Sequence, residues 1–112
     1  MKTYSAQSGY VYQYYYEGQR PFHSAGESGT EFVFSVSGDR KRWGPVSVFA
    51  GDSALDAWQS AHERKLSSSE RYAIAKIALF QAFDERPSPA HMKDDVRIRE
   101  ADVQAIGETL GL

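Results

Sequence analysis

The sequence predicts an α+β fold, in which a three-stranded antiparallel sheet is followed by three helices that pack on one face of the sheet. Twelve of the fifteen aromatic residues lie between Tyr4 and Trp58, and aromatic side chains favour strands. The second half of the chain is rich in alanine, glutamate, arginine and leucine, which favour helices. A chain of 112 residues buries enough surface for one core, so we assign residues 1–112 to a single globular domain.

The first predicted strand runs from Tyr10 to Glu17, where side chains alternate between two faces. Its even-numbered positions are all tyrosines, and Val11, Gln13 and Tyr15 lie on the other face. The tyrosine face either packs under the helices or forms an exposed surface that requires a partner. The sequence does not fix the strand register that decides between these, although a small domain's need for buried area favours packing.

Residues 18–29 are predicted to form an irregular connection. They contain three glycines, two serines and Pro21, and a proline cannot donate a hydrogen bond to a neighbouring strand. A connection of this length is unusual in a compact domain, so we expect it to be mobile or functional.

Two further strands are predicted from Glu31 to Ser37 and from Pro45 to Ala50, because apolar residues recur there at every second position. The polar turn of residues 38–42 between them is short, which predicts that the two strands form a hairpin.

The period of the apolar residues then changes to that of a helix. Ser53 and Asp56 have the spacing of an N-terminal cap, and Leu55, Trp58 and His62 follow along one side of about three helical turns.

A second helix is predicted to open at a capping box formed by Ser67 and Glu70. It runs to about Glu85, because Pro87 follows. This helix is apolar on nearly every side, which predicts a central position with neighbours on more than one face.

The last segment is predicted to begin with a loop from Arg86 to Lys93. Val96 to Ile98 is a candidate for a short fourth strand, and Glu100 to Leu110 has the apolar spacing of a final helix.

Composition excludes several classes of function. The sequence has no cysteine, which excludes disulfides and zinc–thiolate sites and is typical of a cytoplasmic protein. Its start leads into no apolar segment, and no stretch is apolar enough for a membrane span, so we expect neither a secretory signal nor membrane insertion. The net charge of −2 argues against strong non-specific binding to DNA.

The candidate partner-binding residues are the aromatic residues of the sheet and the basic turn that precedes Trp43. Aromatic rings can stack on bases or on protein side chains, and Trp and Arg are enriched at binding hot spots. The residues that we assign to this surface are Tyr12, Tyr14, Tyr15, Phe49, Arg40, Lys41, Arg42 and Trp43.

The three histidines do not form a recognisable catalytic or metal-binding motif. His62 lies on the apolar side of a predicted helix, and His91 with Asp94 and Asp95 lacks the spacing of a strong metal site. His23 lies in the 18–29 connection, where no triad can be identified. We therefore assign no catalytic residue, metal ligand or cofactor, and no motif indicates a family.

These observations predict a small cytoplasmic, non-catalytic binding or regulatory module that contacts a protein partner or a second copy of itself. A first alternative is a single-stranded nucleic-acid binder that uses the tyrosines and the Arg40–Trp43 turn. A second alternative is a small enzyme built around residues 18–29, which is the weakest of the three because no acid–base pair is apparent.

Overall fold

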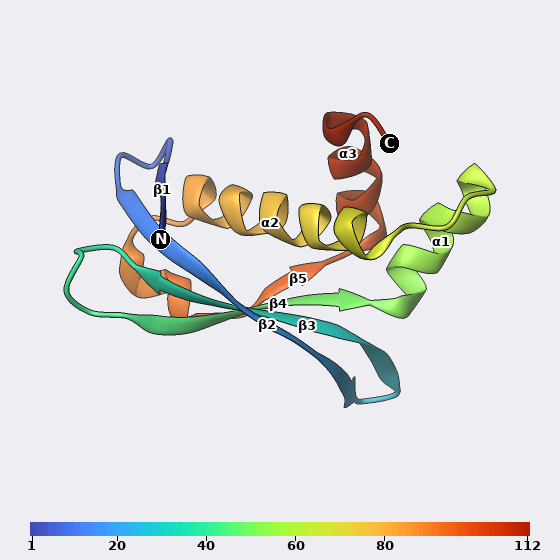
Figure 1. The fold of residues 1–112 in the computed structure, drawn as a ribbon, viewed down its shortest axis with the longest axis horizontal. Coiled ribbons are helices and arrows are strands. Elements are labelled where there is room, and N and C mark those ends of the chain that lie inside the picture. Colours follow the sequence, from blue (N-terminus) through green and yellow to red (C-terminus); the bar gives the residue numbers. More distant parts are fainter.

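The computed structural model describes residues 1–112 and contains one five-stranded sheet, three α-helices and one 3-10 helix (Figure 1). The elements in chain order are β1 (Lys2–Ser5), β2 (Val11–Ser24), β3 (Glu27–Ser37), β4 (Gly44–Gly51), α1 (Asp52–His62), α2 (Ser68–Glu85), η1 (Pro89–Lys93), β5 (Val96–Ile98) and α3 (Glu100–Leu110).

The α+β class is as predicted, but the sheet is larger than predicted. Its strand order is β1-β2-β3-β4-β5, and β1 was not expected. The first four strands pair antiparallel, whereas β5 pairs parallel to β4. The wholly antiparallel description is therefore wrong. A parallel neighbour needs a long crossover connection, and α1, α2 and η1 lie between β4 and β5.

The prediction of an irregular connection at residues 18–29 is also wrong. These residues are the outer part of a long β2–β3 hairpin, which we call the arm, and its turn is formed by Ala25 and Gly26. Both residues have positive φ, at 52° and 77°, the conformation of the tight turn that matches strand twist and favours glycine. Pro21 is tolerated because β1 pairs only with residues 11–14, which leaves the rest of β2 at the edge of the sheet.

The helices agree closely with the sequence signals. At the start of α2, the Ser67 hydroxyl accepts from the Glu70 amide at 3.1 Å, and the Glu70 carboxylate accepts from the Ser67 amide at 2.8 Å, which confirms the capping box. The predicted cap at Ser53 is wrong, because α1 begins at Asp52, and Gly51, two residues before Ser53, occupies the cap position without a side-chain hydrogen bond.

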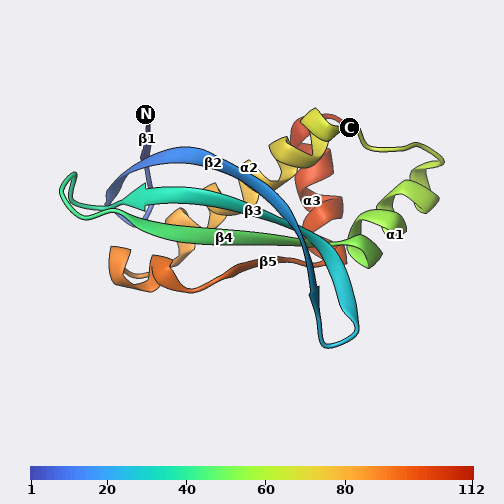
Figure 2. The same cartoon turned by 60° about the horizontal axis from the view of Figure 1, so that its bottom comes forward.

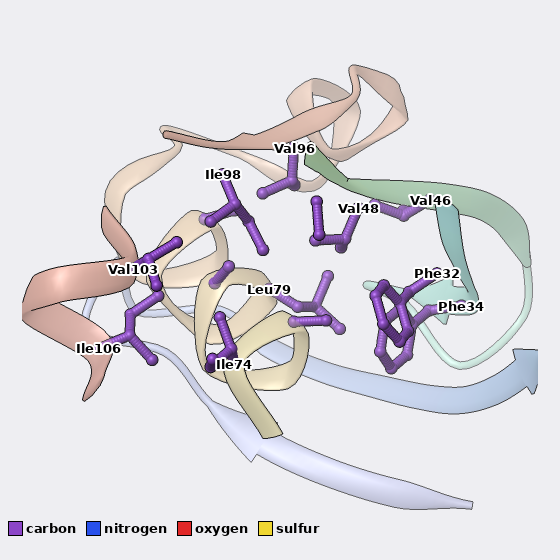
Figure 3. Close-up of a cluster of buried hydrophobic side chains, with 14 of the residues drawn as sticks. Phe32, Phe34, Val46, Val48, Ile74, Leu79, Val96, Ile98, Val103 and Ile106 are labelled. Carbon is purple, nitrogen blue, oxygen red and sulfur yellow. The ribbon is translucent and has the colours of Figure 1, made fainter. Parts of the chain in front are cut away.

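The register places Tyr12, Tyr14 and Tyr16 on the helix-covered face, where Tyr12 and Tyr14 belong to the core and Tyr16 remains 41% exposed. Tyr14 pairs with Val36, and Tyr16 pairs with Phe34, and directly paired residues share one face of a sheet. Tyr12 is fully buried and Tyr14 nearly so. Figure 3 shows buried side chains of the sheet facing those of α2 and α3, among them Phe34 and Leu79.

The helices all lie on the same side of the sheet. Helix α2 lies across one face, and α1 and α3 lie beside its N-terminal end (Figures 1 and 2). Within α2, Leu79 and Phe83 are fully buried while Ile77 and Phe80 are only partly buried, so α2 is central but retains one partly open side. None of the helices combines the length and the apolar character of a membrane-spanning helix.

Candidate functional site on the uncovered sheet face

The opposite face of the sheet carries no helix (Figure 2), and we call it the outer face. Strand pairing assigns its side chains, because residues directly opposite one another share a face. Its side chains include Val11, Tyr15, Arg20, Phe22, Glu31, Val33, Ser47, Phe49 and Arg97, and the β3–β4 turn adds Trp43.

An aromatic pair lies at one end of the outer face. The rings of Tyr15 and Trp43 lie 5.1 Å apart, and the two residues are 43% and 38% exposed. Val11, also 43% exposed, is on the same side of β2. Large apolar side chains with this exposure are typical of a surface that binds a partner.

A second aromatic pair lies where the arm meets β4. The Phe22 and Phe49 rings meet edge to face at 4.9 Å, and the Arg97 guanidinium lies 4.8 Å from the centre of the Phe49 ring. Arg97 also lies 4.0 Å from the Glu27 carboxylate. Gly29, the partner of Phe22 in the ladder, leaves room for the Phe22 ring, because a Cβ there would lie 2.9 Å from the Phe22 Cε1.

A buried carboxylate lies between the two aromatic pairs. Glu31 is 8% exposed, and it accepts hydrogen bonds from the Arg20 Nε at 2.8 Å and from the Ser47 hydroxyl at 2.6 Å. These hydrogen bonds, that from Arg20 foremost, hold the pKa of Glu31 below its usual value. Glu31 is therefore ionised at neutral pH, and the outer face carries charges of both signs.

The basic turn beside Trp43 is held by its own aspartate. The Asp39 carboxylate accepts from the amides of Lys41 and Arg42, both at 2.8 Å. These hydrogen bonds lower the pKa of Asp39. The side chains of Arg40, Lys41 and Arg42 are exposed, as a solvated turn requires.

The structure separates the residues that the sequence placed in one binding surface. Tyr12 and Tyr14 lie in the core, whereas Tyr15 and Phe49 lie on the outer face. The sequence missed Arg20 and Phe22 because they fall in the predicted irregular connection. Alternation along β2 would not have placed them on this face, because a β-bulge between Tyr16 and Gly18 shifts the register.

The histidines lie apart from one another. His62 stacks on Trp58 with ring centres 4.1 Å apart, and its Nδ1 lies 2.9 Å from the Trp58 carbonyl oxygen. His91 contacts the Ser88 hydroxyl at 3.0 Å, and His23 is exposed on the arm. No three His, Asp or Glu residues are grouped closely enough to hold a metal ion.

Comparison of the chain with protein-family models, with curated proteins and with solved structures gave no match.

Proposed function

We propose that this chain is a small non-catalytic binding module that associates with a second copy of itself through the outer face. The observation that carries the proposal is a sheet face without a helical cover, on which Tyr15 and Trp43 are about 40% exposed. Antiparallel sheets commonly leave one face in water, but that face is then polar. A cytoplasmic location is part of the proposal and rests on the absence of cysteine from the sequence.

The size of the outer face is suited to a dimer. The five strands have 4, 14, 11, 8 and 3 residues, and at about 3.3 Å per residue and about 4.8 Å between strands the face covers about 630 Å² before side-chain relief is counted. A standard interface buries about 800 Å² on each partner. The outer face is therefore close in size to one side of such an interface.

The charges on the outer face also suit a second copy. The face carries two arginines, Arg20 and Arg97, and two glutamates, Glu27 and Glu31, so an identical face can present the opposite charge at each position. A net charge of −2 opposes the approach of two copies only weakly.

The nucleic-acid and enzyme hypotheses each required a structural feature that the fold does not have. The nucleic-acid hypothesis required a row of exposed tyrosines, and Tyr12 and Tyr14 are buried. The enzyme hypothesis required an irregular segment at residues 18–29, and those residues are paired strands. Self-association through the outer face does not depend on either observation.

Sedimentation of the native chain and two variants tests the proposal. We expect the native mass to rise with concentration toward twice the 12.6 kDa monomer, and Tyr15→Ser to remain monomeric at the same concentrations. Tyr10→Ser is the matched control, because Tyr10 is 40% exposed but lies off the outer face. Circular dichroism checks that both variants are folded. A folded Tyr15→Ser variant that associates as well as Tyr10→Ser would contradict the proposal.

A further inference from the structure

A groove that adjoins the outer face at Trp43 lies between the β3–β4 turn and η1. Its volume is about 720 Å³, within the range of about 300–1,000 Å³ that is typical of small-molecule sites. Tyr10, Trp43, Pro45 and Met92 supply apolar walls. We call this cavity the η1 groove.

The wall formed by η1 is held firmly in place. The Arg86 guanidinium donates to the carbonyl oxygens of His91, Asp94 and Asp95 at 3.0, 2.8 and 2.9 Å. Pro89 packs against Gly38 so closely that a Cβ on Gly38 would lie 2.5 Å from the Pro89 Cβ. The η1 groove is therefore largely pre-formed, which reduces the entropy lost when a ligand binds.

Tyr12 lines the η1 groove and brings an unused hydrogen-bonding group. Its ring stacks on Phe83 at 4.2 Å, and the residue is 0% exposed. The Tyr12 hydroxyl is the one buried side-chain polar atom that has no hydrogen-bond partner. Such groups are costly and rare in folded proteins. Burial raises the pKa of Tyr12, so the hydroxyl keeps its proton and can donate it to an acceptor.

The charged residues of the η1 groove leave an excess of positive charge. Asp39 is engaged by the backbone amides of its own turn, whereas Arg42 and Lys93 line the groove without an ion-pair partner. A ligand with a negative group would be attracted by these two side chains.

We propose that the η1 groove binds a small molecule that has a flat apolar body and one anionic group. The apolar body lies against Tyr10, Trp43 and Met92, and the anionic group faces Arg42 and Lys93. An acceptor atom of the ligand receives the hydrogen bond of Tyr12, which removes the cost of the unpartnered hydroxyl.

The test uses anilinonaphthalene sulfonate as the probe and phenylnaphthylamine, which has the same rings without the sulfonate, as its uncharged control. We expect one sulfonate dye to bind per chain with increased fluorescence. Tyr12→Phe should weaken binding about fivefold, the worth of one hydrogen bond, and should leave a cooperative thermal transition.

The charge requirement is tested by Arg42→Gln combined with Lys93→Gln. We expect this double variant to weaken binding of the sulfonate dye by about threefold to tenfold and to leave binding of phenylnaphthylamine unchanged. Lys2→Gln combined with Lys65→Gln removes the same amount of charge from outside the groove, and this control should not change the binding of either dye. Equal effects of the two double variants would overturn the proposal.

A further variant separates the η1 groove from the outer face. Phe49→Ser changes the outer face and no residue of the groove, so dye binding should persist. Loss of dye binding in Phe49→Ser, together with normal binding in Tyr12→Phe, would place the dye on the outer face and refute the groove proposal.

Discussion

Glu31 is a buried carboxylate in the middle of the outer face, and its environment makes stability depend on pH. Its folded-state pKa lies below the usual value because Arg20 and Ser47 donate hydrogen bonds to the ionised form. The stabilisation is therefore complete above the unfolded pKa of about 4.3 and is lost as the pH falls through the lower folded pKa.

The variant Glu31→Gln tests this linkage. At pH 7 we expect it to lower the free energy of unfolding by about 1 kcal/mol, since Arg20 is largely exposed and its contribution is screened. At an acidic pH below the unfolded pKa of about 4.3 the difference from the native chain should shrink, because the stabilisation from ionised Glu31 is lost as the pH falls. Urea unfolding at both pH values measures the difference, with exposed Glu17→Gln as the control. A difference of the same size at both pH values would be inconsistent with this account.

At the scale of elements, the arm depends on the close approach of β3 and β4. Gly29→Ala would place a methyl group 2.2 Å from the Ala50 carbonyl oxygen and 2.8 Å from the Gly51 Cα. These are backbone atoms of a paired strand, which cannot move independently, so we expect a loss of about 1–3 kcal/mol of stability.

Gly44→Ala is the matched control for Gly29→Ala. Gly44 also lies in a strand, but a Cβ there meets no atom within 4 Å, so its stability should be unchanged or raised by about 0.4–1 kcal/mol. Thermal unfolding of the two variants compares them directly. Similar transitions for both would show that β3 and β4 do not approach as closely as described.

The elements that could be predicted from the sequence are those with local signals. The capping box at Ser67 and Glu70 marks the start of α2 with a signal that spans only four residues of sequence. Helix α3 likewise follows from its own apolar spacing. Strand β1 has only four residues and no such pattern. It is fixed by tertiary contacts, such as the hydrogen bond from the Tyr4 hydroxyl to the Asp84 carboxylate at 2.8 Å.

The arm could not be predicted because the proline and glycines of residues 18–29, which usually interrupt strands, are tolerated at their positions in this hairpin. Pro21 usually ends a strand, but it is compatible with the edge position that β2 has beyond Tyr14. The candidate site could likewise be predicted only in part. Tyr15, Phe49 and Trp43 were expected from their composition and spacing, whereas Phe22 required the arm to be recognised as a hairpin.

At the scale of the whole molecule, the chain has two layers, and the sheet layer is covered on one side only (Figure 1). The covered side buries a cluster of 23 residues, which is sufficient for a stable core. The aromatic pairs Tyr15–Trp43 and Phe22–Phe49 are therefore not needed for that core, and the proposed contact with a second copy would account for their place on the outer face.

The most direct test is an isotope-filtered NOE experiment on an equal mixture of labelled and unlabelled native chains, which detects only contacts between copies. The account predicts intermolecular NOEs from the ring protons of Tyr15, Trp43 and Phe49. Intermolecular NOEs confined to the opposite side of the molecule, for example at Lys76 and Gln81 of α2, would contradict it. A second outcome would also contradict it. In that outcome no intermolecular NOE is detected, the outer-face protons show no exchange broadening, and the mass at the same concentration is that of a monomer.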